Sequence, residues 1–248
     1  MRDALAELPP EASPAQLLNV ARQLLQGHVY LRVRGPVHDL LAQGAGMPLA
    51  VATIDGERYL MAYSGGAALQ AAARRDGDQD SSAIAQPVLD VLRQVAEGGL
   101  GGIVLDHASG SASAMLPQAL VAKAFADLDP SLALKEALNA ERTPQLSAEV
   151  VRALIAAPLW IAARRGEDGR VGVAEMRTDE GLRVLEVFSH PLELHAFGRG
   201  DQPVRIGAAQ LAAALREDAG LDAVVLNPRG PWLMLDRTDL APIIALAG

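Results

Sequence analysis

The sequence contains one pattern of apolar runs and turn signals twice, first over residues 13–126 and again over residues 147–246. Each copy opens with a helix start signal, continues through an extended run, a hairpin and two helices, and closes on further apolar runs. The offset between matching landmarks falls from 134 residues at the first helix to 121 at a late strand, because two loops are longer in the first copy, at 36–46 and 74–86. A repeat of this length predicts two similar lobes, each with its own core.

Local signals define the elements of both copies. Ser13-Pro14-Ala15-Gln16 is typical of a capping box with proline in the first turn of a helix, and Asp55-Gly56 between apolar runs is typical of a hairpin. In the first copy we predict strands at 29–33, 49–54, 58–63, 103–105 and 112–116, helices at 67–73, 87–97 and 117–126, and a polar loop at 74–86. In the second copy we predict a helix after Ser147, strands at 159–163, 171–176, 182–187, 223–226 and 232–235, and helices at 191–197 and 208–218.

We predict an α+β fold of two similar lobes, each a mostly antiparallel (mixed) sheet with packed helices. The hairpins make neighbouring strands antiparallel, and the helix before a later strand adds one parallel pairing. The lobes are residues 13–126 and 147–246, joined by a linker at 127–146. In that linker, Asp129-Pro130 and Thr143-Pro144 bracket a short helix.

Composition narrows the classes of function. The formal net charge of −8 disfavours binding to nucleic acid and to anionic membranes. The absence of cysteine excludes disulfides, thiol catalysis and thiolate metal sites. No apolar run reaches the roughly 18 residues of a membrane span, and the N-terminus carries no secretory signal pattern. Abundant Ala, Gly and Arg with little Lys is typical of a GC-rich bacterial genome, so we expect a bacterial cytoplasmic protein.

Two strand ends carry polar residues that resemble parts of a catalytic site. Asp106-His107, with Ser109 and Ser111 nearby, offers an acid, a base and a nucleophile. Neighbouring residues at a strand end point apart, however, and the second copy has Asn-Pro in place of Asp-His. We therefore interpret the segment as a turn in which Asp or Asn satisfies backbone amides.

Ser64 and Ser189 follow equivalent strands, and each precedes a predicted helix. We interpret both as helix N-caps, with Pro191 close to the first turn of the second helix. No catalytic residue is assigned.

Metal and phosphate sites are not indicated either. His190 and His195 are five residues apart, which does not place them on one helix face, and no zinc-protease or calcium-loop motif occurs. The glycine-rich run 98–102 precedes a strand, whereas phosphate-binding loops follow one, so we assign it to helix termination. We predict no metal and no cofactor.

A protein interface is the remaining signal. Trp232 follows a Pro/Gly-rich loop that contains Arg229, and Trp160 lies in a predicted strand. Tryptophan and arginine are favoured anchors of protein interfaces, so these three residues are our interface candidates.

The repeated unit resembles the SseB-type (enhanced serine sensitivity) N-terminal domain. The resemblance lies in a hairpin ending in aromatic-Ser, a helix just beyond it, and a helix leading to an apolar strand that ends in Asn-Pro. The second copy shows this at 184–189, 192–197 and 224–228, and the first copy diverges, with Tyr63-Ser64 and Asp106-His107. The resemblance implies no agreed enzymatic activity. The same name is attached to a type III secretion translocon component, but this chain lacks that protein's apolar membrane-inserting stretches and long heptads.

The expected function is therefore a non-enzymatic cytoplasmic adaptor or binding protein, whose partner is another protein or, as a homodimer, a second copy. One alternative is an enzyme acting on a small acyl or amino-acid-related substrate at a cleft between the lobes. The other is a secretion-system accessory or chaperone-like protein, which would need an exposed apolar groove and a secreted client.

Overall fold

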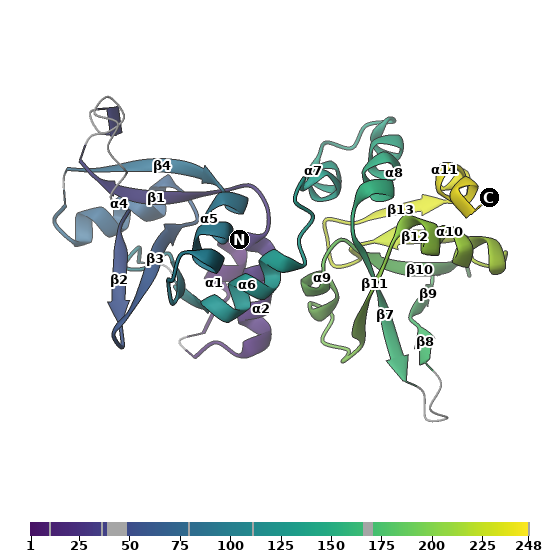
Figure 1. The fold of residues 1–248 in the computed structure, drawn as a ribbon, viewed down its shortest axis with the longest axis horizontal. Coiled ribbons are helices and arrows are strands. Elements are labelled where there is room, and N and C mark those ends of the chain that lie inside the picture. Colours follow the sequence, from purple (N-terminus) through teal and green to yellow (C-terminus); the bar gives the residue numbers. More distant parts are fainter. Residues whose placement is uncertain are drawn as a thin grey trace. The chain divides into compact units, whose positions relative to one another are not determined.

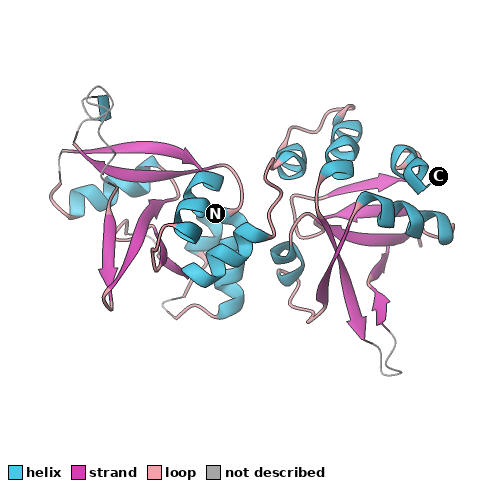
Figure 2. Cartoon of the chain, viewed as in Figure 1, coloured by secondary structure: helices cyan, strands magenta, loops and turns pink. Residues whose placement is uncertain are grey.

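The computed structural model describes residues 1–248 apart from residues 10, 36, 39–48, 79, 111, 166–170 and 248. The described chain divides into two compact units, residues 1–126 (lobe 1) and residues 127–248 (lobe 2). In each lobe, helices flank a mixed β-sheet (Figures 1 and 2). Most of the predicted loop at 36–46 lies outside the described residues.

Lobe 1 follows the predicted order of elements. Its helices are α1 (Arg2–Ala6), α2 (Pro14–Leu24), α4 (Gly66–Arg75), α5 (Val88–Glu97) and α6 (Gln118–Ala126). Its strands are β1 (His28–Arg34), β2 (Val51–Ile54), β3 (Glu57–Tyr63), β4 (Ser81–Pro87), β5 (Gly102–Leu105) and β6 (Ala114–Pro117). The sheet order is β4-β1-β3-β5-β6, with β2 paired to β3.

Lobe 2 repeats this order. Its helices are α7 (Ala133–Asn139), α8 (Leu146–Ala156), α9 (Pro191–His195), α10 (Ala208–Glu217) and α11 (Ala241–Ile244), and a 3-10 turn (Ala245–Ala247) follows. Its strands are β7 (Leu159–Arg165), β8 (Val171–Val173), β9 (Glu175–Arg177), β10 (Arg183–Phe188), β11 (Gln202–Ile206), β12 (Ala223–Leu226) and β13 (Leu233–Asp236). The sheet order is β11-β7-β10-β12-β13, which matches lobe 1 strand for strand.

The predicted pairings are confirmed. β2 and β3 form a hairpin across Asp55 and Gly56, which both have positive φ angles (50° and 84°). β3 pairs with β5 in parallel, as β10 does with β12, and the other pairs are antiparallel. Ser13 and Gln16 form the predicted capping box at α2.

Three strand regions differ from the sequence prediction. β4 lies where we predicted a loop, and β11 lies where we assigned no strand. Both are edge strands, whose partly or fully exposed residues lack a continuous apolar run. The strand predicted at 171–176 is two short strands: β8 pairs with β7, and β9 pairs with β10. The chain changes partner at Ala174, whose N–H donates to the carbonyl of Ala162.

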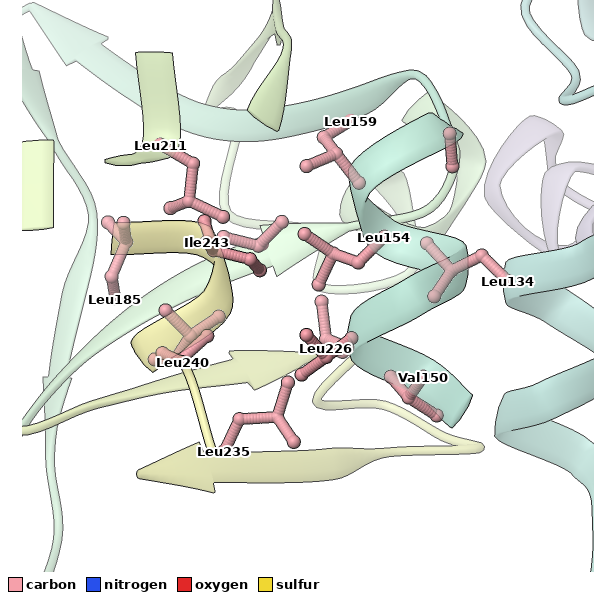
Figure 3. Close-up of a cluster of buried hydrophobic side chains, with 14 of the residues drawn as sticks. Leu134, Val150, Leu154, Leu159, Leu185, Leu211, Leu226, Leu235, Leu240 and Ile243 are labelled. Carbon is pink, nitrogen blue, oxygen red and sulfur yellow. The ribbon is translucent and has the colours of Figure 1, made fainter. Parts of the chain in front are cut away.

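The segment predicted as a linker, 127–146, belongs to lobe 2. It forms α7, and Leu134 and Leu138 of this helix are buried in the main core of the lobe. Figure 3 shows Leu134 beside side chains of α8, which meet Leu226 of the sheet. The segment therefore contributes core residues to lobe 2.

Each sheet buries both of its faces. We call the face that carries the main core of lobe 2, against α8, α10 and α11, the first face. Alternate strand residues point to the second face, where Trp160 and Phe188 pack with Leu194 of α9. In lobe 1 the second face carries Met61 and Tyr63, covered by α4.

Candidate functional site

The carboxyl ends of the parallel strands are held by one polar pair in each lobe. In lobe 1 the backbone N–H and the hydroxyl of Ser64 each donate to a carboxylate oxygen of Asp106, both at 2.6 Å. In lobe 2 the N–H of Ser189 donates to the Oδ1 of Asn227, and the Asn227 amide donates back to the Ser189 hydroxyl, both at 2.9 Å. Asp106 and Asn227 have positive φ angles of 53° and 44°, which Asp and Asn tolerate better than most residues.

This pairing corrects the interpretation of the two serines as helix caps. In lobe 1 the N-cap of α4 is Gly65, without a side-chain cap. In lobe 2 the N-cap of α9 is His190, whose Nδ1 accepts the N–H of Leu192 at 3.0 Å. The serines instead join two strands that are adjacent in the sheet but distant in the chain.

The same contacts define what Asp106 can do chemically. Its carboxylate faces Ser64, while His107 is exposed and Ser109 donates its hydroxyl to the Asp106 carbonyl at 2.8 Å. Ser111 lies outside the described residues. A relay needs the acid against the imidazole and the imidazole against the nucleophile. The Asp106 contacts instead form a strand-end clasp, in agreement with the turn predicted from the sequence.

Buried charges occupy the second face of lobe 2. Glu186 on β10 and Asp201 before β11 are each 3% exposed. Arg199 forms ion pairs with Glu186 and with Asp201, the latter at 2.9 Å. Asp201 also forms an ion pair with Arg164 at 2.7 Å. The hydrogen bond with Glu186 is the main cause that raises the pKa of Arg199. Both acids are thus neutralised beneath the surface.

Aromatic rings on this face carry further arginines. The guanidinium carbons of Arg199 and Arg229 lie 4.2 and 5.6 Å from the centre of the Phe197 ring. Arg205 lies 5.9 Å from the centre of the Trp160 ring. Such distances are those of cation–π contacts. We call this set the arginine–aromatic face: Trp160, Arg164, Phe197, Arg199, Arg205 and Arg229.

The three interface candidates from the sequence differ in exposure. Trp232 is 55% exposed, and Arg229 is exposed on the same loop, 227–232. The loop is held by the Gly230 N–H, which donates to the Asn227 carbonyl at 2.7 Å, and by Arg142, which donates to the Trp232 carbonyl. Trp160 is only 4% exposed, because it packs between the sheet and α9. It therefore supports the surface beneath Arg205.

Lobe 1 has a charged second face of a different kind. Arg32 on β1, 6% exposed, pairs with Asp76 and, at 2.6 Å, with Asp78, and donates to Ser81 at 2.9 Å. Hydrogen bonds from Ser81 and then Arg32 lower the pKa of Asp78 to about 2. Burial raises the pKa of the neighbouring Tyr63. This cluster joins Asp76 and Asp78, which follow α4, to Arg32 of the sheet.

Two open hollows lie elsewhere on the described surface. One of about 440 Å³ in lobe 2 is lined by one side of α8, including Ile155, and by Pro242. The other, of about 800 Å³ in lobe 1, lies between the β2–β3 turn and the glycine run. Gly98 ends α5 there, as predicted, and a Cβ at Gly102 would lie 2.1 Å from the Leu116 carbonyl oxygen. The glycine run thus permits close strand packing.

Within the described part of the chain, no group of three or more His, Cys, Asp or Glu side chains is placed to hold a metal ion. In the same part, no helix has the length and apolar character needed to cross a membrane.

The model of the SseB protein N-terminal domain family matches the chain twice, over residues 1–122 and 133–241. The chain belongs to the SseB N-terminal domain family. It carries two tandem copies of the domain, and the second match begins at α7, in agreement with the place of this helix in lobe 2. No curated protein and no solved structure showed a significant match. The clasp between Ser and Asp or Asn therefore occurs at the same place in both SseB domains.

Sequence reasoning found the residues of the clasp but not their pairing. It also missed the arginine–aromatic face, apart from Arg229 and Trp160. The position of Arg205 opposite Trp160 follows from the register of β11, and this strand was not predicted.

Proposed function

We propose that this tandem SseB-domain protein is a non-enzymatic binding protein of the bacterial cytoplasm, and that lobe 2 binds another protein through the 227–232 loop. The observation that carries the proposal is the exposure of Trp232 together with Arg229 on a loop that internal hydrogen bonds hold in place. Met234, two residues further along, is 41% exposed and extends the apolar surface.

Leaving Trp232 exposed has a cost in folding free energy, which favours a role for this side chain in binding. A tryptophan that is half exposed forgoes much of the free energy that its burial would contribute, and tryptophan and arginine dominate the energetics of protein interfaces. The loop also follows β12, next to the parallel strand pair, and ligand sites often lie at the carboxyl ends of such strands.

The strand-end residues support a binding role in preference to catalysis. Ser64 and Ser189 are occupied in equivalent clasps, and Asp106 is directed to Ser64. These hydrogen bonds join the ends of the two parallel strands in each lobe, which is a structural role.

The test is partner binding by the full chain and two variants. Proteins captured from a bacterial lysate are identified, purified and titrated against wild type, Trp232→Ala and Ile155→Ala. Ile155, 40% exposed on α8 beside the first-face core, is the matched control. We expect Trp232→Ala to weaken the dissociation constant by about tenfold or more, as for interface hot spots, and Ile155→Ala to leave it unchanged. The proposal would be contradicted if the partner bound wild type, Trp232→Ala and Ile155→Ala with equal affinity. It would also be contradicted if no captured protein bound the wild type in solution.

A further inference from the structure

From the arginine–aromatic face we infer that lobe 2 recognises an acidic segment of its partner, one in which Asp or Glu alternates with apolar residues. This inference rests on the proposed protein-binding function and specifies the chemistry of the partner. It is carried by the distribution of charge on the second face and by a difference between the two lobes at equivalent positions.

The face presents cations to solvent and hides its anions. Glu186 and Asp201 are buried and paired, whereas the side chain of Arg164 is 61% exposed, and Arg205 and Arg229 are exposed as well. Among the described residues, Arg205 and Arg229 have no carboxylate within ion-pair distance. In a chain with a net charge of −8, this is a local positive surface that an acidic segment would complement.

Aromatic rings lie within cation–π distance of both arginines. A guanidinium that stacks on a ring uses its flat face and keeps its N–H groups available to a carboxylate. Arg205 lies over Trp160 and Arg229 lies near Phe197, and a ring contact that persists in solution restricts an arginine side chain before a partner arrives. Less entropy is then lost on binding.

Lobe 1 lacks both arginines. Arg205 pairs in register with Trp160 on β7, and the equivalent residue opposite Tyr30 on β1 is Ala85. Arg229 is the second residue after Asn227, and the second residue after Asp106 is Ala108. The fold is thus built in lobe 1 with alanine at both positions, so packing of the sheet does not require arginine there.

The apolar part of the segment follows from the neighbours of these arginines. Phe197 is partly buried, and Trp232 is exposed on the Arg229 loop. A segment of alternating acidic and apolar residues matches both features. A nucleic acid carries a charge on every nucleotide and would meet a stronger repulsion from the net charge of the chain than a short peptide. A second copy of this chain could also bind to this face, and the test below distinguishes it from an acidic segment of another protein.

The test uses a short fluorescein-labelled peptide of alternating Glu and Phe residues, followed by fluorescence anisotropy with the full chain. The double variant Arg205→Ala with Arg229→Ala gives lobe 2 the residues of lobe 1. The double variant Arg152→Ala with Arg216→Ala removes the same charge from exposed positions on α8 and α10, which pack on the first face.

We expect saturable binding by wild type that weakens with added salt, a loss of about tenfold or more in the first variant, and no change in the second. Equal binding by all three proteins, or equal binding of a Lys-and-Phe peptide, would overturn the inference. Tighter binding of a single-stranded oligonucleotide to the same arginines, or a wild-type dimer that Arg205→Ala with Arg229→Ala dissociates, would also overturn it in favour of those occupants.

The outcome separates this inference from the proposed function. If the peptide fails to bind while Trp232→Ala still disrupts a protein complex, the acidic chemistry is wrong and the binding function stands. If the peptide binds but no protein partner depends on Trp232, the proposed interface is wrong.

Discussion

On the second face of lobe 1 the buried charge of the sheet is a cation, Arg32 on β1, whereas in lobe 2 it is an anion, Glu186 on β10. The partners are reversed accordingly. Asp76 and Asp78 lie after α4, and Arg199 lies after α9, in the segments that lead to the edge strands β4 and β11. The buried charge on the sheet thus has opposite signs in the two domains, while the exposed Arg164 on β7 pairs with Asp201 in the same sense as Arg32 on β1 pairs with its acids.

The clasp at the strand ends behaves differently, because both lobes keep a serine opposite Asp or Asn. The comparison indicates that the clasp is set by the backbone, since its acceptor receives a main-chain N–H at a fixed place. A buried charge on the sheet needs only a partner of opposite charge, so the charge can be positive or negative and can lie on either strand. The surface above it was free to diverge too, which is how lobe 2 carries arginines where lobe 1 has alanines.

The largest expected effect concerns the helix that covers the second face. In lobe 1, α4 has ten residues and buries Leu69 and Ala72. In lobe 2, α9 has five residues, and its Glu193 is joined to Lys135 of α7 at 2.7 Å, with both side chains at most 4% exposed. We therefore expect lobe 2 to depend on this ion pair.

Lys135→Met should lower the free energy of unfolding of lobe 2 by about 3–5 kcal/mol, because it removes the cation that compensates the buried Glu193 carboxylate. The double variant with Glu193→Leu should recover most of that loss, since it removes both charges. Tryptophan fluorescence during urea unfolding measures lobe 2 alone, because Trp160 and Trp232 are the tryptophans of the chain and both lie in lobe 2. An unchanged midpoint for Lys135→Met would refute the dependence.

A smaller effect tests the reversed ion pairs directly. Arg32→Met should destabilise lobe 1, and Glu186→Met lobe 2, each by about 2–4 kcal/mol, less than for Lys135 because the partners are partly exposed. Tyrosine absorbance reports lobe 1, since Tyr30, Tyr59 and Tyr63 all lie there, and tryptophan fluorescence reports lobe 2. If Glu186→Met changed only the tyrosine signal, or neither signal, the proposed equivalence of the two clusters would fail.

The sequence predicted the parts of the molecule that local rules determine. The duplicated order, the Asp55-Gly56 hairpin and the parallel pair follow from periodicity and turn chemistry, which act over short distances. The edge strands were missed because residues such as Ser81, Ser82 and Gln86 form a half-exposed strand with no apolar run. The short helix in segment 127–146 was predicted, but it was assigned to a linker because proline signals bracket it, although Leu134 and Leu138 share one face of the helix.

The candidate site could not be predicted from short stretches of sequence, because its residues are far apart in the chain. Ser64 and Asp106 are 42 residues apart in the chain, and Ser189 and Asn227 are 38 apart. A serine before a helix is a sound local indication of a cap, and only the parallel pairing of the strands shows that each serine has a nearer partner. The arginine–aromatic face depends in the same way on register.

The smallest expected effect concerns exchange of the clasp between lobes. Asp106→Asn gives lobe 1 the pair found in lobe 2, and Asn227→Asp does the reverse. Each should change the free energy of unfolding by less than about 1 kcal/mol, because Asn and Asp both tolerate the positive φ angle and both accept the serine N–H.

Alanine at either position is the matched contrast, since it removes the acceptor and leaves the serine N–H unsatisfied. Asp106→Ala and Asn227→Ala should each cost about 1–3 kcal/mol, seen in the tyrosine signal for the first and the tryptophan signal for the second. Should the exchanges cost as much as the alanines, each clasp would be specific to its own lobe. The shared backbone position would then not be what selects the residue, because a position that required only an acceptor at positive φ would accept either side chain.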